Sequence, residues 1–202
     1  MAAWHEEVWA AVPRDAVPER FAERRELLLA DVIPGQRVLD LGCGDGSFAA
    51  ALLGAGASVV GADVSAEALR RAREAAPAAE FVQSDEGAPL PFADGSFELV
   101  WCGETLEHVV DVSQLLGEVR RVLAAGGMLL ATTPNQARLA VALEALTGNR
   151  LDRRLDPRSD HLRFFTARTL RSLLSDAGFA QVSVTAVDGF PLVRRSLIAR
   201  AR

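Results

Sequence analysis

The chain has 202 residues, a formal net charge of −5 and a hydrophobic fraction of 50%, which suits one domain with a substantial core. Its apolar runs are shorter than a membrane span, and its first residues lack the pattern of a secretory signal, so neither membrane insertion nor secretion is expected. The two cysteines, Cys43 and Cys102, indicate reduced thiols in the cytoplasm rather than a disulfide framework.

Residues 1–34 are expected to form an N-terminal helical segment ahead of a domain over 35–202. The apolar spacing predicts an amphipathic helix over 16–31, which Pro34-Gly35 ends. Three residues before this helix, Trp4, His5 and Trp9, have two open interpretations. They either cover a pocket as a lid or simply pack on the surface.

A glycine-rich turn follows the first predicted strand. Residues 38–46 read Val-Leu-Asp-Leu-Gly-Cys-Gly-Asp-Gly, an apolar strand that runs directly into three glycines. Glycine lets the backbone approach a ligand where a side chain would collide. A second apolar run ends at Asp63, 23 residues after Asp40, where an acid can accept hydrogen bonds from both hydroxyls of a ribose. The pair predicts a nucleotide-type cofactor at the carboxyl ends of adjacent parallel strands.

The charges around this turn favour one cofactor over another. A dinucleotide fingerprint is spaced G-x-G-x-x-G, whereas Gly42, Gly44 and Gly46 are spaced G-x-G-x-G and are flanked by Asp40 and Asp45. Two carboxylates repel a pyrophosphate, but they suit a cofactor that carries an ammonium and a sulfonium. On charge grounds, S-adenosylmethionine is therefore favoured over NAD.

Strands and helices then alternate, which implies a parallel sheet covered on both faces, with right-handed crossovers. Strands are predicted at 37–41, 58–62, 79–83, 97–102 and 127–133, and helices at 46–53, 65–75 and 111–123. Asp111 and Gln114 suit the N-terminal cap of the last of these helices. A further helix is predicted between Thr166 and Gly178, followed by strands at 180–186 and 191–199.

Residues 135–165 interrupt the alternation and are predicted to be an insertion. A helix over 135–147 is followed by an arginine- and aspartate-rich stretch, and residues 138–171 hold eight arginines against four acids. These arginines either face an acidic substrate or nucleic acid, or form a solvated, ion-paired surface. Because insertions at the carboxyl edge of such a sheet lie over the ligand crevice, we expect this one to line the substrate pocket.

Several blocks within residues 35–185 resemble the class I S-adenosylmethionine-dependent methyltransferases. They are residues 38–46, 61–65, 84–85, 90–100, 106–109, 118–127 and 133–135. The resemblance implies a Rossmann-like, doubly wound α/β fold whose seven-stranded sheet is mostly parallel with one antiparallel strand, with helices on both faces. It also implies a role for Asp85 in binding the adenine amino group, within a cofactor-binding set of Asp40, Gly42, Gly44, Asp63, Val64, Asp85 and Cys102.

A second polar group follows the fourth predicted strand. Glu104, Glu107 and His108 lie at the same carboxyl edge, and His161 closes the insertion. Two carboxylates and two imidazoles suit a divalent metal, and on a helix Glu104 would lie beside both Glu107 and His108. The pattern resembles the ubiquinone-pathway O-methyltransferases, which act on catechols, and the small-RNA 3′-terminal 2′-O-methyltransferases. In both groups the matching residues hold a metal that engages neighbouring substrate oxygens.

Three interpretations of this group stay open. It is a metal site, an acid–base or substrate-contacting site without metal, or a structural cluster. For catalysis the candidates are Glu107, His108 and His161.

The sequence as a whole predicts a cytoplasmic enzyme that moves a methyl group from S-adenosylmethionine to a hydroxyl oxygen of a small molecule, as a monomer or homodimer. The alternative enzyme is an RNA 3′-end 2′-O-methyltransferase, but the negative net charge argues against a nucleic-acid partner. The other alternative is a module that binds S-adenosylmethionine without catalysis.

Overall fold

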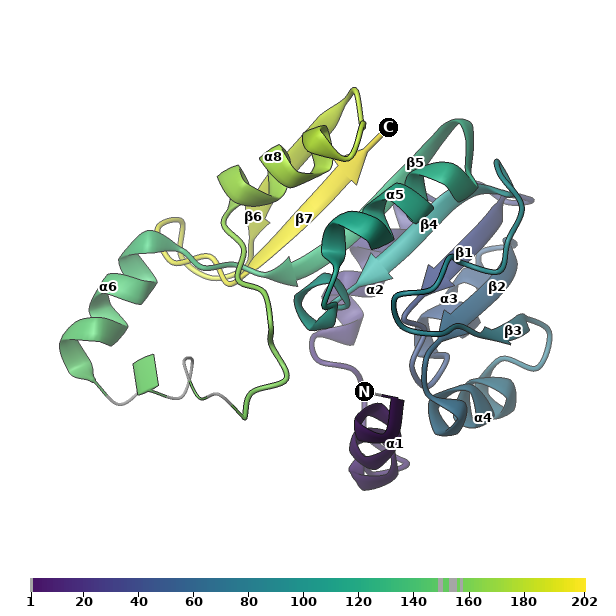
Figure 1. The fold of residues 1–202 in the computed structure, drawn as a ribbon, viewed down its shortest axis with the longest axis horizontal. Helices are drawn as coiled ribbons and strands as arrows, with labels where there is room; N and C mark the ends of the chain where they lie inside the picture. Colours follow the sequence, from purple (N-terminus) through teal and green to yellow (C-terminus); the bar gives the residue numbers. More distant parts are fainter. Residues whose placement is uncertain (1, 149–150, 153–155, 157) are drawn as a thin grey trace.

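The computed structural model describes residues 2–148, 151–152, 156 and 158–202, and Arg150, Arg153 and Arg154 of the predicted arginine-rich stretch lie outside them. Its centre is a seven-stranded sheet in the order β3-β2-β1-β4-β5-β7-β6. The strands are β1 (Arg37–Leu41), β2 (Ser58–Asp63), β3 (Glu80–Gln83), β4 (Phe97–Gly103), β5 (Leu123–Pro134), β6 (Val182–Val187) and β7 (Ser196–Ala201). Strand β7 is antiparallel to both β5 and β6, and the other neighbours are parallel. This sheet confirms the expected Rossmann-like α/β fold (Figure 1).

Helices cover both faces of the sheet (Figure 1). They are α1 (Ala2–Ala11), α2 (Phe21–Leu29), α3 (Ser47–Gly54), α4 (Ala66–Ala75), α5 (Val112–Val122), α6 (Arg138–Thr147) and α8 (Ala167–Asp176), with a short 3₁₀ helix η1 (Leu106–His108). One apolar cluster includes Leu116 of α5 and Leu170 of α8, and another includes Leu28 of α2 and Leu52 of α3. Burial of these two clusters is the main force that holds the helices on the sheet.

Side-chain caps set the starts of two helices as predicted. The Asp111 carboxylate accepts a hydrogen bond from the Gln114 N–H at 2.9 Å, and Thr166 forms a reciprocal capping box with Thr169. Gly178 follows the end of α8 with φ 89°, a backbone conformation that favours glycine.

Some element boundaries differ from the predictions for local reasons. Helix α2 begins at Phe21 instead of 16, directly after Arg20 in the left-handed region. Helix α6 begins at Arg138 instead of 135, because Asn135 and Gln136 stay extended and the Gln136 N–H donates to the carbonyl of Phe165. The last strand spans Ser196–Ala201 instead of 191–199, since the chain turns through positive φ at Asp188 and Gly189 before it pairs.

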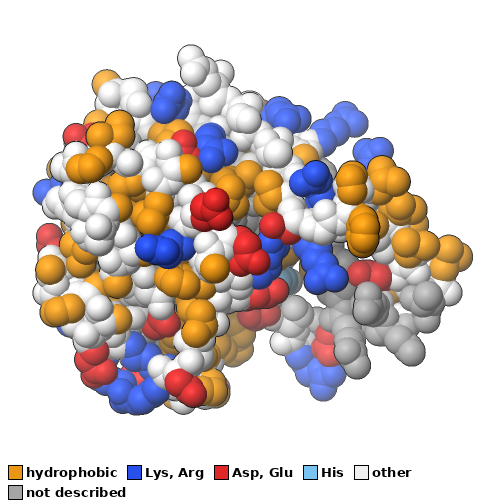
Figure 2. Space-filling view, turned by 180° about the vertical axis from the view of Figure 1, so that it is seen from behind, with side chains coloured by type: hydrophobic (Ala, Val, Ile, Leu, Met, Phe, Trp, Pro, Cys, Tyr) orange, Lys and Arg blue, Asp and Glu red, His pale blue; other side chains and the backbone are white. Residues whose placement is uncertain are grey.

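Helix α6 stands apart from the sheet at its outer end (Figure 1). The view from behind shows hydrophobic side chains exposed on this separate lobe (Figure 2), and Leu139, Leu143 and Leu146 are exposed on α6. None of the helices in the described parts of the chain has the length and apolarity of a membrane span.

Candidate active site

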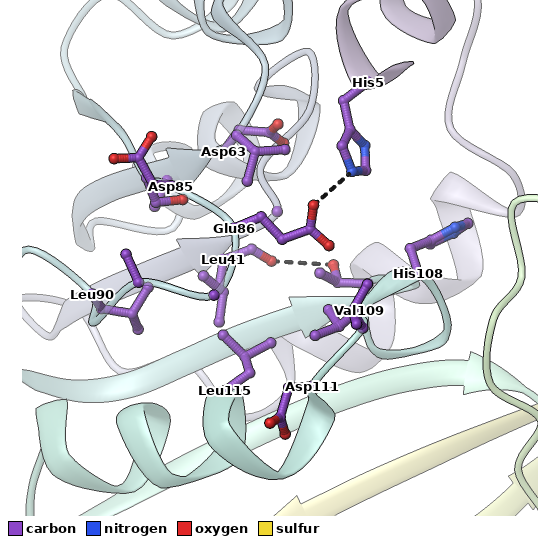
Figure 3. A pocket seen from close by; sticks show the side chains of 18 of the residues that line it. His5, Leu41, Asp63, Asp85, Glu86, Leu90, His108, Val109, Asp111 and Leu115 are labelled. Carbon is purple, nitrogen blue, oxygen red and sulfur yellow. Dashed lines mark hydrogen bonds and ion pairs between the residues drawn. The ribbon is translucent and has the colours of Figure 1, made fainter. Parts of the chain in front are cut away.

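A cavity of about 600 Å³ opens at the carboxyl ends of the parallel strands (Figure 3). Its walls come from the ends of β1 and β2, the loops after β3 and β4, the first two turns of α5 and, on another side, α1. Strands β1 and β4 are neighbours although β2 and β3 intervene in the sequence, so this edge holds the topological switch point of the sheet. Open α/β sheets bind their ligands at such a point, and the volume suits a small-molecule ligand.

Four residues of the predicted cofactor set border this cavity: Gly42, Asp63, Val64 and Asp85. Asp63 ends β2 and is held firmly, since its Oδ2 accepts from the Gly44 N–H at 3.0 Å and its Oδ1 from the Ser65 N–H at 2.9 Å. Burial raises the pKa of Asp63 above its usual value, although these backbone hydrogen bonds work in the opposite direction. The carboxylate at the end of the second strand is thus fixed at the cavity wall, as a ribose-binding acid requires.

Two other members of that set lie beneath the cavity wall. Asp40 is 1% exposed, and burial together with the charge of Asp63 raises its pKa to about 7. Its charge at neutral pH is therefore only partial, which weakens the charge argument made for it from the sequence. The Cys102 side chain is fully buried in the apolar cluster that packs under α5 and does not border the cavity, so its contact with the cofactor stays a prediction.

The glycine turn is crowded by the protein's own side chains. A Cβ atom on Gly42 would lie 2.5 Å from Thr105 Oγ1, and one on Gly44 would lie 2.8 Å from Cζ2 of Trp9. Both glycines also have positive φ, 72° and 53°. Only glycine therefore allows this turn, and the indole of α1 covers it.

A carboxylate and two imidazoles meet at the same edge of the sheet. One possible ligand atom from each of Glu107, His108 and His161 lies within 4.8 Å of the others, and the two imidazole centroids are 4.9 Å apart. The cause is a backbone contact, because the Glu107 carbonyl accepts hydrogen bonds from the N–H groups of Leu162 at 2.8 Å and Arg163 at 3.0 Å. The end of the insertion is thus held against the loop after β4. Three of the four predicted metal ligands, Glu107, His108 and His161, therefore lie close together.

The hydrogen bonds around these three residues leave ligand atoms free. His108 Nδ1 lies 3.0 Å from the Asp160 carbonyl oxygen, which can only accept, so Nδ1 carries the hydrogen and Nε2 keeps its lone pair. Glu107 is 1% exposed, and its Oε2 accepts from Thr133 Oγ1 at 2.9 Å. Its Oε1 is buried and has no hydrogen-bond partner among the described residues. One carboxylate oxygen and two imidazole nitrogens fit the ligand preferences of several divalent metals.

Glu104 departs from its predicted place. It precedes η1 and has φ 56°, so it does not lie on one helix with Glu107 and His108, and it is absent from the group of converging ligand atoms among the described residues. The Glu104 N–H donates to the Thr132 carbonyl at 2.9 Å, and its side chain borders the cavity instead. Positive φ at a non-glycine residue is strained, and such strain is typical of functional sites.

The insertion contributes less to the cavity than expected. Within the described part of 135–165, only Asp160 borders it, and α6 lies away from it. The reason is the extended pairing of Asn135 and Gln136 with Phe165, which brings the two ends of the insertion together and directs α6 outward.

Helix α1 supplies cavity residues that sequence reasoning left undecided. Trp4, His5, Val8 and Trp9 of α1 border the cavity at helical spacing, and Val12 just after the helix borders it too. That spacing is the signal that would have identified a common face. His5 Nε2 lies 4.0 Å from Glu86 Oε2, a residue that the sequence analysis did not single out (Figure 3). The lid interpretation is thus favoured by the structure over simple surface packing.

The raised pKa of Glu107 predicts a pH effect on stability. Burial and the neighbouring Glu104 raise it to about 8, so the folded state holds a proton that the unfolded state loses near pH 4.3. Between these values the folded state binds more protons, and stability should fall as pH rises. In metal-free protein, Glu107→Gln should remove much of this fall and stabilise at pH 8 by on the order of 2 kcal/mol. Urea unfolding at pH 6 and 8 measures the free energy of unfolding, and Glu80→Gln, at an exposed position, is the matched control. If the free energy of unfolding changes equally with pH in wild type and in Glu107→Gln, the raised pKa is contradicted.

Comparisons with known proteins agree with this geometry. The family described as "Methyltransferase domain" matches residues 14–184. A ubiquinone biosynthesis O-methyltransferase of Thiobacillus denitrificans is 32% identical over 171 residues, which are 80% of this chain and 72% of that protein. A malonyl-[acyl-carrier protein] O-methyltransferase of Erwinia billingiae is 40% identical over 99 residues, 49% of this chain and 39% of that protein.

A solved structure extends the comparison to the fold. A protein of Pyrococcus horikoshii OT3 superposes with a TM-score of 0.74 at 23% identity, over 96% of this chain and 97% of that one. This likeness concerns the fold alone, whereas the family match and the first relative concern the sequence. The chain belongs to the S-adenosylmethionine-dependent methyltransferases.

Proposed function

We propose that this methyltransferase transfers the methyl group of S-adenosylmethionine to a hydroxyl oxygen of a small molecule. One observation carries the proposal: Glu107, His108 and His161 bring ligand atoms within 4.8 Å of one another, and His108 borders the cavity that Asp63 also borders. A methyl donor and groups that activate an acceptor oxygen would then share one site.

The cavity suits the cofactor in shape and charge. Asp63, Asp85 and Glu86 all border the cavity (Figure 3), which supports a ribose bound by Asp63 and an adenine beside the loop after β3. The cofactor supplies a methyl group on a positively charged sulfur, which a cavity edge rich in carboxylates accommodates. Glu104 borders the same cavity and adds to its negative character.

A divalent metal fits the three converging residues. Glu107 Oε1 is a buried oxygen without a hydrogen-bond partner among the described residues, and His108 is oriented by the Asp160 carbonyl. A cation held by Glu107, His108 and His161 would lower the pKa of the acceptor hydroxyl. Without a metal, the His108 Nε2 lone pair would act as the general base, because burial lowers the pKa of this imidazole and keeps it neutral.

The relatives support oxygen as the acceptor atom, since both are named O-methyltransferases. A small molecule is favoured over nucleic acid by the net charge of −5. Action in the cytoplasm as a monomer or homodimer remains part of the proposal.

Methyl transfer from labelled S-adenosylmethionine to catechols, other hydroxylated small molecules and RNA 3′ ends tests the proposal. Each acceptor is assayed with added divalent metal and with chelator. Transfer to a small-molecule hydroxyl supports it, transfer confined to RNA favours the alternative enzyme, and no transfer despite cofactor binding favours a non-catalytic module.

The Asp63 carboxylate should account for much of the cofactor affinity. Asp63→Ala would leave the ribose hydroxyls without their acceptor and should weaken binding of S-adenosylhomocysteine by roughly 1–3 kcal/mol. Calorimetry measures this, and Asp176→Ala serves as a control on an exposed acid at the end of α8 that does not border the cavity. Unchanged affinity in folded Asp63→Ala would contradict the ribose assignment.

Metal affinity should increase with pH. Binding requires ionised Glu107, whose pKa is raised to about 8, so below that value each metal ion displaces one proton. Affinity should rise by up to about tenfold per pH unit between pH 6 and 8. Electron paramagnetic resonance during a titration with Mn²⁺ measures the dissociation constant at each pH. An affinity that does not change with pH would argue against Glu107 as a ligand.

His161 should be needed for turnover but not for cofactor binding. His161→Ala removes one of the three ligand atoms and should lower turnover by roughly 10²-fold, with nearly unchanged affinity for S-adenosylhomocysteine. Arg158→Ala is the matched control, since this exposed residue of the same segment pairs with Asp156. Turnover of His161→Ala equal to wild type would remove His161 from the mechanism. If the variant loses turnover while the turnover of wild type is insensitive to chelator, the metal-free site is favoured.

A further inference from the structure

Helix α1 forms one wall of the cavity although it precedes the sheet in the sequence. Its Trp4, His5, Val8 and Trp9 border the cavity, so this face of α1 meets a cavity instead of a packed core. Figure 3 shows the His5 ring directed inward toward Glu86. A helix placed in this way gains little from apolar burial, and its position depends on the contacts at its two ends.

Glu6, in the second turn of α1, makes the contact that lies nearer the start of the helix. Its Oε1 accepts from the Ala66 N–H at 2.5 Å, and its Oε2 accepts from the Glu67 N–H and from Ser65 Oγ, each at 3.1 Å. These N–H groups belong to the first turn of α4, where they have no partner within the helix and the helix dipole favours an anion. Burial opposes ionisation of Glu6, but these hydrogen bonds outweigh it and hold its pKa below the usual value.

Arg71 makes the contact at the other end of α1. Its guanidinium donates to the carbonyls of Trp9 at 2.8 Å and Val12 at 2.9 Å, which lie where the helix ends. Both contacts are therefore made to α4, one at its first turn and one at its middle. Between them the Trp9 indole lies on the glycine turn, close to Gly44.

The docked helix is linked to the cofactor acid through one residue. Ser65 donates its hydroxyl to Glu6 and its backbone N–H to Asp63. A shift of Glu6 therefore acts on the hydrogen bonds that orient Asp63 and on the indole that covers Gly44.

We propose that Glu6 is a positioning residue of the cofactor site, which docks α1 on α4 so that the helix closes over bound S-adenosylmethionine. This inference rests on the proposed cofactor role of Asp63 and Gly44. Because Trp9 covers the glycine turn in the docked position, the cofactor enters and leaves only when α1 lifts. Glu6 thereby sets how long the cofactor or its demethylated product stays bound.

The dissociation rate of S-adenosylhomocysteine from the full chain tests the proposal. Stopped-flow tryptophan fluorescence follows release, with Trp9 as the reporter nearest the glycine turn. Glu6→Gln keeps the side-chain length but loses the charge and one acceptor, and should speed release about tenfold, equivalent to about 1.4 kcal/mol. Glu7→Gln changes the same residue type at an exposed position of the same helix and should match wild type. Arg71→Ala, which frees the other end of α1, should also speed release.

The outcomes separate the possible failures. Unchanged release from Glu6→Gln, with or without a lower melting temperature, would mean that Glu6 only caps α4 and would overturn the proposal. Release from Glu7→Gln as fast as from Glu6→Gln would overturn it as well, because the effect would then not depend on the docking contact. If wild type does not bind S-adenosylhomocysteine in calorimetry, the cofactor role itself fails and the inference falls with it.

Discussion

The candidate site depends on the contacts of one residue, Glu107. It follows β4, its carboxyl accepts a hydrogen bond from Thr133 of β5, and its carbonyl accepts two more from Leu162 and Arg163 at the end of the insertion. Three parts of the chain that are distant in sequence therefore meet at one buried position. The register of β4 against β5 favours the side-chain contact, because Gly103 pairs with Thr132, and Thr133 is the next residue of β5. The two imidazoles come together as a consequence of this arrangement.

The same edge of the sheet concentrates buried carboxyl groups. Burial raises the pKa values of Asp40, Asp63 and Glu107, and like-charged neighbours raise those of Asp40 and Glu107 further. Arg24 is the nearby buried cation, 8% exposed and 4.7 Å from the centroid of the Phe48 ring, and its pKa is lowered by burial. A site with raised carboxyl pKa values is stabilised by a cationic ligand, because the ligand favours the ionised form. A sulfonium, an ammonium and a divalent metal all satisfy that condition, so one electrostatic property supports both proposed ligands.

Much of the fold was predictable because its signals are local. The glycine turn, the acid at the end of β2, the caps at Asp111 and Thr166 and the alternation of strands and helices each depend on a few neighbouring residues. The convergence of His161 on Glu107 was expected from a family resemblance, whereas the hydrogen bonds that cause it join residues more than 50 positions apart. Glu104 does not share a helix with Glu107 and His108, because η1 begins only at Leu106 and Glu104 has positive φ. The sequence does not show this local break in the chain. The position of α1 was also beyond the sequence, because Glu6 finds its partners 59 to 61 residues further along the chain.

The central claim is that the cofactor and a metal-binding acceptor site share the carboxyl edge of this sheet. A crystal structure of the full chain with S-adenosylhomocysteine and Mn²⁺, recorded at a wavelength that gives anomalous signal from manganese, tests it most directly. We expect ribose density on Asp63 and an anomalous peak within about 2.0–2.3 Å of ligand atoms of Glu107, His108 and His161. Ribose density elsewhere would contradict the cofactor site, and its presence on Asp63 without an anomalous peak at the three residues would contradict the metal site.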